Sequence, residues 1–524
     1  MPVASREFVL HDSAGTGPDL LRAVAGAASD SIAWANGGPV STYRRTWLDT
    51  FDWRLYRAGL TLEQVTASAG AILTLTGRDG EVLASERLQR GAATWPSLLT
   101  ALPDGPLREL LEPVAGVRAL SPVAKAASSV AELRALNADA KTIARLAVDR
   151  MSVTFPAHAI APARLSLSPV RGYVGQTEKA ARALAALPGV GRGRGSALET
   201  ALAAAGRRPG ELPGKAAAIA LTPAMPARAA MAAILAELLG SLEANVPGTV
   251  KDVDTEFLHD LRIAVRRTRS ALKLCCNALP DGLAARFAPE FRWLGELTTP
   301  TRDLDVYLLG FDSMAAGLVS ATEIELAPFR DYLLKSRAVA HRHLVRGLRS
   351  ARFRRLTADW RAALEGVGAP SKRTTVAQLA DTKIGIAHRR ALRAGQNLTA
   401  SSPSESLHDL RKRCKELRYV VEMFGSLHDP AQRWQAVREL KALQDCLGEF
   451  QDAEVQRDEI RAFAAQMLAD RTAPAETLLA MGEIAAGLAL RQRAARARFD
   501  HAFANFASPP SKARLAALAR MSAA

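Results

Sequence analysis

The sequence predicts a multidomain chain in which an N-terminal α+β domain precedes a C-terminal all-α domain. Three observations support this prediction. Short strand-like runs separated by turn signals fill the first third of the chain. Long helical segments follow from residue 227 onward. Within the helical part a block of sequence returns at a constant offset of 149 residues, which predicts two related helical halves.

Length, composition and charge limit the classes of function. At 524 residues the chain is long enough for two or more domains. Hydrophobic residues make up 48% and charged residues 23%, as is typical of a soluble globular protein. A net charge of +16 favours a polyanionic partner: nucleic acid, an anionic membrane or polyphosphate. Aromatic residues make up only 5%, which is few for a protein that stacks single-stranded bases.

The N-terminal part alternates short strand-like runs with turns such as Gly77-Arg78-Asp79-Gly80. The expected strands are Phe8–Leu10, Tyr43–Leu48, Leu60–Val65, Ala71–Thr76, Val82–Ser85 and Thr142–Val148. Short helices are expected at Trp95–Ala101 and Pro106–Leu111. Residues 185–228 are rich in Gly, Pro and Arg and predict a mobile linker. Their glycines lack the Lys-Ser/Thr ending of a phosphate-binding loop.

Helical periodicity dominates the rest of the chain. The expected helices are 227–245, 255–279, 284–297, 301–319, 321–349, 352–366, 373–396, 404–425, 430–448, 450–470 and 474–503. Breakers such as Thr299-Pro300 separate several of them. Asp254 and Ser404 are the expected N-caps of the two helices described next, because each is followed by an acid in the first turn.

One predicted helix carries a basic stripe beside its buried face. Residues 257–273 read FLHDLRIAVRRTRSALK and contain no Pro or Gly. An apolar stripe at helical spacing consists of Leu258, Leu261, Val265, Thr268 (a weak member) and Leu272. One position later, a basic stripe follows the same spacing at His259, Arg262, Arg266, Arg269 and Lys273. Because the bases flank the buried stripe, we expect them to line a groove towards a neighbouring helix.

The pattern returns in residues 407–424, LHDLRKRCKELRYVVEMF. Here the apolar stripe is Leu407, Leu410, Cys414, Leu417 and Val421, and the basic stripe is His408, Arg411, Lys415 and Arg418. His259 and His408 are 149 residues apart, and so are Asp303 and Asp452 in a second matching segment. A charge run on one helix is usually a solvated face. Its recurrence in register in both copies favours a function instead.

These two helices, with the segments WLGELTTPTRDLDVY and LKALQDCLGEFQDAEV, resemble the CHAD domain over roughly residues 221–510. The resemblance implies an all-α domain at residues 229–510, with two helical-bundle halves at about 229–370 and 371–510 around a pseudo-two-fold axis. It further implies a basic central channel that binds inorganic polyphosphate.

The basic stripes are suited to binding a linear polyanion. Such a ligand has no base-like edge for a protein to recognise, so its binding site needs many cationic donors in a line. The expected polyphosphate-binding residues are His259, Arg262, Arg266, Arg267, Arg269, Lys273, His408, Arg411, Lys412, Lys415 and Arg418. Weaker candidates are Lys383, Arg390 and Arg393. The acids at repeated positions, Asp260, Asp409, Asp303 and Asp452, are expected to brace arginines, with Arg302 as a partner, rather than to catalyse.

The two histidines, His259 and His408, have two equal interpretations: contact with phosphate, or a core imidazole bonded to a carboxylate. Phosphate contact predicts modestly stronger binding at mildly acid pH, because phosphate favours the imidazolium. Neither histidine has a second His or Cys at ligand spacing, so no metal site is expected.

Residues 48–65, LDTFDWRLYRAGLTLEQV, resemble a segment of CYTH domains, the triphosphate tunnel metalloenzyme fold, and the domain is expected at 1–184. The resemblance implies an eight-stranded barrel or tunnel that binds a triphosphate and a divalent metal. Of the family's E-x-E-x-K strand only Glu7 remains, since Val9 and His11 replace the other two residues. Leu62-Glu63-Gln64-Val65 replaces L-R-x-R, and Leu73-Thr74-Leu75-Thr76 replaces L-T-L-K. Acidic ligands and basic donors are thus depleted, and we expect a degenerate, non-catalytic domain.

The expected function is cofactor-free binding of inorganic polyphosphate, in a bacterial cytoplasm and on polyphosphate granules. One alternative is a metal-dependent triphosphatase or polyphosphatase acting through the CYTH-like domain. Another alternative is nucleic-acid binding. The sequence has few aromatic residues and no base-reading motif, so only weak binding of RNA at low salt is expected.

Cellular context follows from three further features. The four cysteines, Cys275, Cys276, Cys414 and Cys446, form no CxxC and are expected to be buried free thiols in a reducing compartment. No signal peptide is evident at the N-terminus. The longest apolar run, around Ala229–Leu239, is interrupted by Glu237 and is too short to span a bilayer, so no membrane partner is expected.

Overall fold

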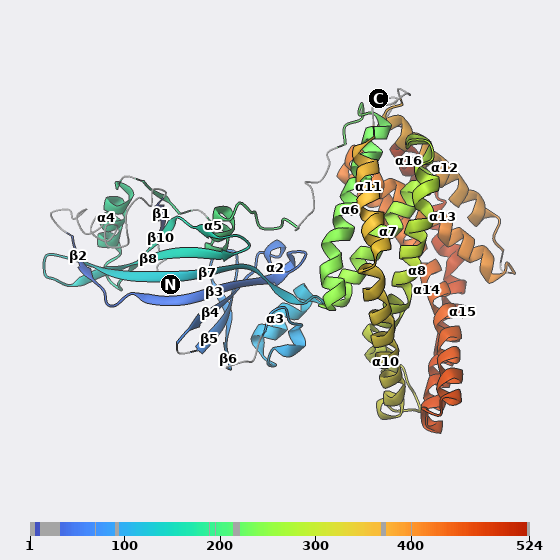
Figure 1. Cartoon of the computed structure of the whole chain (residues 1–524), viewed down its shortest axis with the longest axis horizontal. Helices are drawn as coiled ribbons and strands as arrows, with labels where there is room; N and C mark the ends of the chain where they lie inside the picture. The colour runs from blue at the N-terminus through green and yellow to red at the C-terminus, as the bar shows by residue number, and fades with distance from the viewer. Residues whose placement is uncertain are drawn as a thin grey trace. The chain divides into compact units, whose positions relative to one another are not determined.

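The computed structural model describes residues 6–10, 32–68, 70–89, 94–187, 189–193, 195–212, 221–367, 374–399 and 401–520. The chain divides into two compact units, Met1–Pro213 and Gly214–Ala524. Figure 1 shows that the first is built on a β-sheet and the second on helices. The predicted order, an α+β domain followed by an all-α domain, is confirmed.

The first unit contains one antiparallel sheet with the order β11-β1-β10-β8-β7-β3-β4-β5-β6, to which β2 adds on β7 and β9 on β8. The strands are β1 (Arg6–Leu10), β2 (Ala33–Asn36), β3 (Ser41–Thr50), β4 (Thr61–Ala67), β5 (Gly70–Thr76), β6 (Val82–Leu88), β7 (Leu120–Leu136), β8 (Thr142–Phe155), β9 (Ala159–Ile160), β10 (Ala163–Pro169) and β11 (Val190–Arg192).

Every predicted strand is present in this sheet, and the sequence missed β2, β7, β9, β10 and β11. The longest of them, β7, reads LSPVAKAASSVAELRAL and is rich in Ala and Ser, which have little strand propensity of their own. Its pairing with β3 and β8 on both sides holds it in the sheet. Tertiary pairing therefore decides this element.

In the described part of this unit, four helices accompany the sheet: α2 (Arg54–Arg57), α3 (Pro106–Ala115), α4 (Val174–Ala185) and α5 (Ala197–Ala204). The expected helix at Trp95–Ala101 is reduced to a 3₁₀ turn at Leu99–Ala101. The prediction of a mobile linker over 185–228 was wrong for part of its length, because β11 pairs with β1 and α5 is a capped helix. Apolar residues of α5 pack with Trp47 and Met151 in a common core.

The second unit is all helical, with short 3₁₀ turns after α7 and α13. Its helices are α6 (Ala227–Lys251), α7 (Thr255–Leu274), α8 (Leu283–Leu309), α9 (Phe311–Ala315), α10 (Glu323–Leu348), α11 (Ala351–Glu365), α12 (Val376–Gln396), α13 (Ser404–Met423), α14 (Pro430–Ala469), α15 (Ala475–Phe506) and α16 (Pro509–Leu518). A main core joins residues from α6 to α16, and a second core joins one end of α8 to α10, α14 and α15. In Figure 1 α10, α14 and α15 run together away from the other helices.

Several helix boundaries differ from those predicted, and three differences change the number or length of the helices substantially. A single α8 runs through Pro300, where a break was expected, because Leu297 and Leu304 on either side of the proline are buried. Interior proline costs about 3 kcal/mol, which burial of this helix offsets. A single α14 of 40 residues replaces two expected helices. Beyond the predicted end of the domain, α16 adds one more helix.

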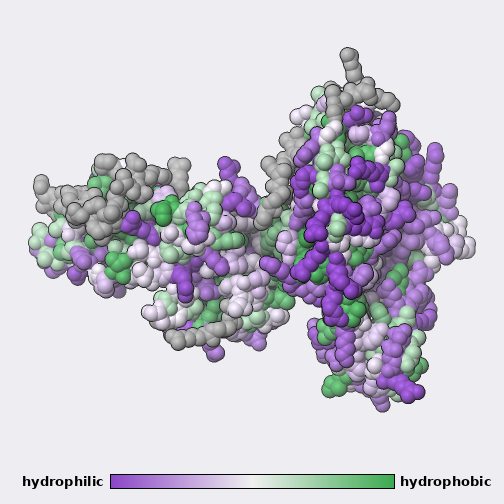
Figure 2. Space-filling view, viewed as in Figure 1, coloured by the Kyte–Doolittle hydropathy of each residue, from purple (hydrophilic) through white to green (hydrophobic). Residues whose placement is uncertain are grey.

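The surface of the helical unit is mostly polar in the face that Figure 2 shows. One described helix, α6, is long and apolar enough to cross a membrane by length and composition alone. A core helix of a soluble protein passes the same test, and residues such as Met231, Leu235 and Leu239 of α6 are buried in the main core. Among the cysteines, Cys275, Cys414 and Cys446 are buried, whereas Cys276 is exposed, contrary to prediction.

Candidate functional site

Helices α7 and α13 are held by the apolar stripes that the sequence predicted. All five positions of each stripe are buried. The carboxylate of Asp254 accepts hydrogen bonds from the backbone N–H groups of Glu256 and Phe257, so the predicted N-cap of α7 is confirmed. The cap predicted for α13 was wrong, because Ser404 already lies inside the helix, which begins after Pro403. Burial of both stripes fixes which faces the two helices turn towards each other.

Two ion pairs join α7 to α13. Arg267 Nη2 lies 2.9 Å from Glu422 Oε2, and Lys273 Nζ lies 2.6 Å from Glu416 Oε1. The repeat offset makes Glu416 the counterpart of Arg267, and Glu422 the counterpart of Lys273. Each pair is thus the other's image under a pseudo-two-fold axis, as at an isologous interface. The predicted pseudo-symmetry of the two halves is confirmed here.

Three adjoining hollows lie along the junction of α7 and α13, and together they are called the groove. The dyad hollow has a volume of about 540 Å³ and lies between α7, α8, α13 and α14. The crossing hollow, of about 680 Å³, shares Arg266 and Lys415 with it. The end hollow, of about 290 Å³, shares Lys273 and Glu416 with the crossing hollow. The groove is therefore continuous along the junction of the two repeats.

Repeat-related residues supply most of the lining of the dyad hollow. The pairs are Arg262 and Arg411, Arg266 and Lys415, Arg302 and Gln451, Asp303 and Asp452, Val306 and Val455, and Tyr307 and Gln456. The pseudo-two-fold axis of the helical unit therefore runs through this hollow.

The groove is cationic in sum. Lysine and arginine side chains that line it are Arg262, Arg266, Arg269, Lys273, Arg292, Arg302, Lys383, Arg390, Arg411, Lys412, Arg413 and Lys415. Far fewer carboxylates line it, namely Asp303, Asp409, Glu416, Asp452 and Glu459. Such a surplus of positive charge in a concave surface raises the local concentration of anions.

Most of the predicted site residues reach this groove. Those that line it are His259, Arg262, Arg266, Arg269, Lys273, Arg411, Lys412 and Lys415. Of the weaker candidates, Lys383 and Arg390 line the end hollow. Arg267 lines a further hollow beside Leu238 and Met423, which shares only Tyr419 with the crossing hollow. His408, Arg418 and Arg393 line none of the three hollows of the groove.

Arg262 and Arg411, although equivalent, are both bound to neighbouring helices. Arg262 Nη1 donates to the hydroxyls of Thr298 and Thr299, at 2.9 and 2.8 Å. Arg411 donates to Gln451 Oε1 at 2.9 Å and to Asp452 Oδ1 at 3.0 Å. Asp452 therefore braces an arginine, as expected. These two arginines hold the walls of the groove as well as lining it.

Several cations that line the crossing hollow have no carboxylate partner. Among the described residues, Arg266, Arg269, Arg292 and Lys415 have no ion pair within 4.0 Å. Lys273 is engaged by Glu416, and Lys412 Nζ lies 3.3 Å from Asp409 Oδ1. Two of the cations without a carboxylate partner, Arg266 and Lys415, are repeat counterparts, and Arg269 lies one turn along α7 from Arg266.

Of the cations that line the groove, Lys415 has the most strongly shifted pKa. Burial, together with Arg411 and Arg266, lowers the pKa of Lys415 to about 8. Desolvation and like charges both disfavour the ammonium form. An anion bound beside Lys415 would restore its pKa, because an opposite charge stabilises the ammonium.

The surroundings of both histidines lower the pKa of the imidazole and so favour its neutral form. Burial lowers the pKa of His259, and the nearby charge of Arg302 lowers it further. Burial and the charge of Lys412 lower the pKa of His408 in the same way. In the described part of the chain neither imidazole has a hydrogen bond to a carboxylate. His259 lines the dyad hollow, so it is the better placed of the two to contact an anion.

Sequence reasoning missed several residues of the groove, among them Arg292 on α8, Arg413 and Tyr419 on α13, and Ser270 on α7. Ser270 and Tyr419 could have been found, because they are related by the same offset of 149 residues as the basic stripes. No signal marked Arg292, which reaches the groove only because α8 packs against α7. Within the described ranges, no three His, Cys, Asp or Glu side chains are grouped to hold a metal ion.

In the first unit, the charged residues on one face of the sheet pair with each other. Arg45 on β3 forms ion pairs with Glu63 on β4 and with Asp149 on β8, the latter at 2.6 Å. On the same face, Ser166 donates to Glu7 at 2.6 Å, and Arg164 Nη2 lies 3.6 Å from Glu7 Oε2.

Helix α5 lies against this face. Arg164 Nη1 donates to Thr200 Oγ1 of α5 at 2.8 Å, and Leu198 and Leu202 pack with Trp47. Glu63 occupies a position where the resembled family has arginine, and its carboxylate neutralises Arg45 rather than a ligand. His11, the third position of the depleted motif, lies outside the described residues.

Comparisons with known proteins give one family match and several similar solved structures. A search of curated proteins finds no match. Among solved structures, the chain is similar to the CHAD domain of the plant Ricinus communis, with 25% identity over 55% of this chain and 95% of that one and a TM-score of 0.48. It is also similar to PptA from Streptomyces chartreusis, with 19% identity over 53% of this chain and 99% of that one and a TM-score of 0.41.

A third similar structure is a proposed adenylyl cyclase from Hippeastrum described as having a dominant triphosphatase activity. It shares 13% identity over 39% of this chain and 95% of that one, with a TM-score of 0.27. The family profile of the CHAD domain matches residues 233–461, which include both basic helices and the pseudo-two-fold junction between them. The helical unit of this chain therefore carries a CHAD domain.

Proposed function

We propose that the helical unit binds inorganic polyphosphate in the groove between its two repeats. The observation that carries this proposal is the alignment of cations from both repeats along continuous hollows, with Arg266, Arg269 and Lys415 free of carboxylate partners among the described residues. The resemblance of the two basic helices to the CHAD domain, for which polyphosphate is the expected ligand, supports the same ligand.

The shape of the groove favours a linear anion over a compact one. The basic stripe of α7 spans 15 residues from His259 to Lys273, and the 14 steps between them correspond to roughly 21 Å of helix. Each internal unit of polyphosphate carries a negative charge, so a chain laid along the groove would meet cations at successive turns. A nucleic acid is the competing ligand, and single-stranded binding usually requires aromatic platforms. Tyr307 and Tyr419 are the aromatic residues lining the described groove.

The variant Arg266→Ala/Lys415→Ala tests the proposal. These residues are repeat counterparts, line two hollows and have no carboxylate to release. Each is expected to contribute roughly 1.5 kcal/mol as a charge-assisted contact, so affinity for polyphosphate should fall about a hundredfold. Titration of labelled long-chain polyphosphate at physiological salt, with single-stranded RNA as competitor, measures the change.

The matched control removes two charges from α12 instead, as Arg389→Ala/Arg393→Ala, because both residues are exposed and line none of the three hollows. An Arg262→Ala/Arg411→Ala variant is less informative, since it also removes bonds that hold α8 and α14. An equal loss in the control, or equal competition by RNA, would mean that the groove is a general cationic surface.

The proposed cellular setting is a bacterial cytoplasm, with the protein located on polyphosphate granules. Recruitment of the fluorescently tagged protein to granules, and its loss in Arg266→Ala/Lys415→Ala, would test that placement. Diffuse distribution of the tagged parent protein in granule-containing cells would contradict it.

A further inference from the structure

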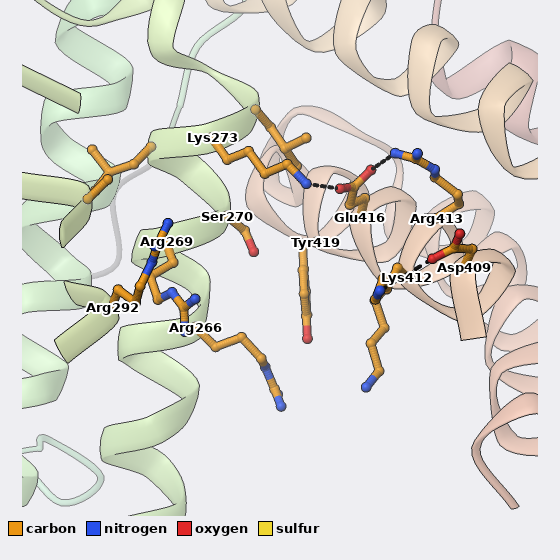
Figure 3. Close-up of a pocket in the computed structure, with 14 residues that line it drawn as sticks. Arg266, Arg269, Ser270, Lys273, Arg292, Asp409, Lys412, Arg413, Glu416 and Tyr419 are labelled. Atoms are coloured by element: carbon orange, nitrogen blue, oxygen red, sulfur yellow. Dashed lines mark hydrogen bonds and ion pairs between the residues drawn. The ribbon is translucent and has the colours of Figure 1, made fainter. Parts of the chain in front are cut away.

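The crossing hollow contains two hydroxyl groups that no ion pair or described hydrogen bond accounts for. Tyr419 is 6% exposed, and its hydroxyl oxygen is buried without a hydrogen-bond partner among the described residues. Ser270 lines the same hollow from α7. Figure 3 shows both hydroxyls directed into the space between the basic side chains of α7 and those of α13. A buried hydroxyl is usually paired, so an unpaired one calls for an explanation.

The two hydroxyls occupy equivalent positions in the repeats. Ser270 and Tyr419 are 149 residues apart and line the same hollow. In sequence, Ser270 lies midway between Arg267 and Lys273, and Tyr419 lies midway between their partners Glu416 and Glu422. The pseudo-two-fold axis therefore passes close to both. A ligand group on the axis would meet one hydroxyl from each repeat.

The ring of Tyr419 is held in place independently of its hydroxyl. The guanidinium carbon of Arg266 lies 5.5 Å from the ring centroid, and that of Arg418 lies 5.8 Å from it. Both distances fit cation–π contacts. Phenylalanine at this position would keep the ring and its contacts, so the hydroxyl alone is available for another purpose.

The surroundings of the hydroxyl fit a phosphoryl group. Arg266, Lys412 and Lys415 line the hollow around Tyr419, and their charges would neutralise phosphoryl oxygens. Hydroxyl groups donate short hydrogen bonds to ionised oxygens. A neutral donor at the axis adds a contact without adding to the repulsion among the cations.

We propose that Tyr419 Oη and Ser270 Oγ donate hydrogen bonds to one phosphoryl group of the bound polyphosphate at the pseudo-two-fold axis. This inference rests on the proposed function and specifies its central contact. A phosphoryl group would attract the charged groups of Arg266 and Lys412. It would then reach the hydroxyl of Tyr419, which lies beneath them. The two hydroxyls thereby fix one phosphoryl unit of the chain relative to the groove.

The test compares Tyr419→Phe and Ser270→Ala with the parent protein, using tripolyphosphate and long-chain polyphosphate as probes. Tyr419→Phe should weaken binding of tripolyphosphate about tenfold, as loss of a hydrogen bond to a charged acceptor does. Ser270→Ala should weaken it about threefold. The loss should be smaller for the long chain, which has many other contacts. Tyr332→Phe, whose partly buried hydroxyl lies on α10 away from the groove, is the matched control and should bind as the parent does.

Thermal unfolding without ligand separates binding from a structural role. Tyr419→Phe removes an unpaired buried hydroxyl, so its Tm should equal or exceed that of the parent. A lower Tm together with weaker binding would mean that the hydroxyl supports the fold, and would overturn the inference.

The binding data distinguish this inference from the function on which it rests. If the parent binds neither probe, both fail. If the parent binds, Arg266→Ala/Lys415→Ala does not, and Tyr419→Phe binds within twofold of the parent, the polyphosphate groove stands and the hydroxyl contact is overturned.

Discussion

At the scale of single residues, Lys415 is the cation of the groove whose charge is least well compensated by nearby acids. It lines two hollows, and Arg411 and Arg266 lie nearby. Helical periodicity was enough to place Lys415 on the basic stripe. Its lowered pKa of about 8 could not be predicted, because that value depends on burial and on Arg266 from the other repeat. Spatial neighbours from distant sequence decide a pKa.

The affinity for polyphosphate should therefore depend on pH above neutrality. A bound polyanion raises the pKa of Lys415 above its free value of about 8, so binding takes up a proton once the free lysine has titrated. Binding is strongest below pH 8 and weakens as the pH rises from 8 towards the higher pKa of the complex. Titrations between pH 7 and 10 measure this decline, with Lys415→Arg as control because arginine stays charged. An unchanged slope in Lys415→Arg would assign the dependence to another group.

At the scale of elements, α7 and α13 show how far a repeat can be interpreted from sequence. The offset of 149 residues identified both buried stripes, and both are buried. It did not reveal that cations of α7 form ion pairs with acids of α13 that are not their repeat counterparts. Lys273, for example, pairs with Glu416, which is the counterpart of Arg267. That pairing depends on where the two helices cross. Breaks in helices were also misjudged, because packing of α8 overrides Pro300.

Glu416 should restrain binding, whereas its counterpart across the axis should not. Glu416 engages Lys273 and Arg413 and lines the crossing and end hollows, so Glu416→Ala frees two cations and removes a negative charge from the groove. Affinity for polyphosphate should rise a few fold, as titration would measure, at a cost of about 1 kcal/mol or less in the free energy of unfolding.

The control is Glu422→Ala, which removes the pseudo-symmetric ion pair with Arg267 and a second ion pair with Arg418. Neither Glu422 nor these two arginines line the three hollows of the groove, so affinity should stay near that of the parent. An equal rise in both variants would indicate a general charge effect.

At the scale of the whole molecule, the chain combines a sheet unit whose charges are paired internally with a helical unit whose cations face open hollows. The sheet unit resembles a triphosphate-binding fold in sequence, yet Glu63 and Asp149 neutralise Arg45, and α5 contacts Arg164 on the same face. Anion binding is therefore expected from the helical unit.

The full chain should release no phosphate from tripolyphosphate in steady state when Mg²⁺ or Mn²⁺ is added. A hard cation requires several oxygen ligands, and in the first unit Glu7 is bonded to Ser166 and faces Arg164. A phosphate-release assay with each metal measures this. Metal-dependent release that Glu7→Ala abolishes, but that Arg266→Ala/Lys415→Ala leaves intact, would instead make the first unit a triphosphatase.

The sequence alone determined the order of the two units, the duplicated helices and the residues of their basic stripes, because periodicity and repeats are local properties of the chain. Tertiary structure decided which of those bases line the groove. It brought Arg266 and Lys415 together, bound Arg262 and Arg411 to neighbouring helices, and left His408 outside. It also placed Ser270 and Tyr419 at one axis. These outcomes depend on how helices far apart in sequence pack, and periodicity within a single helix carries no information about that.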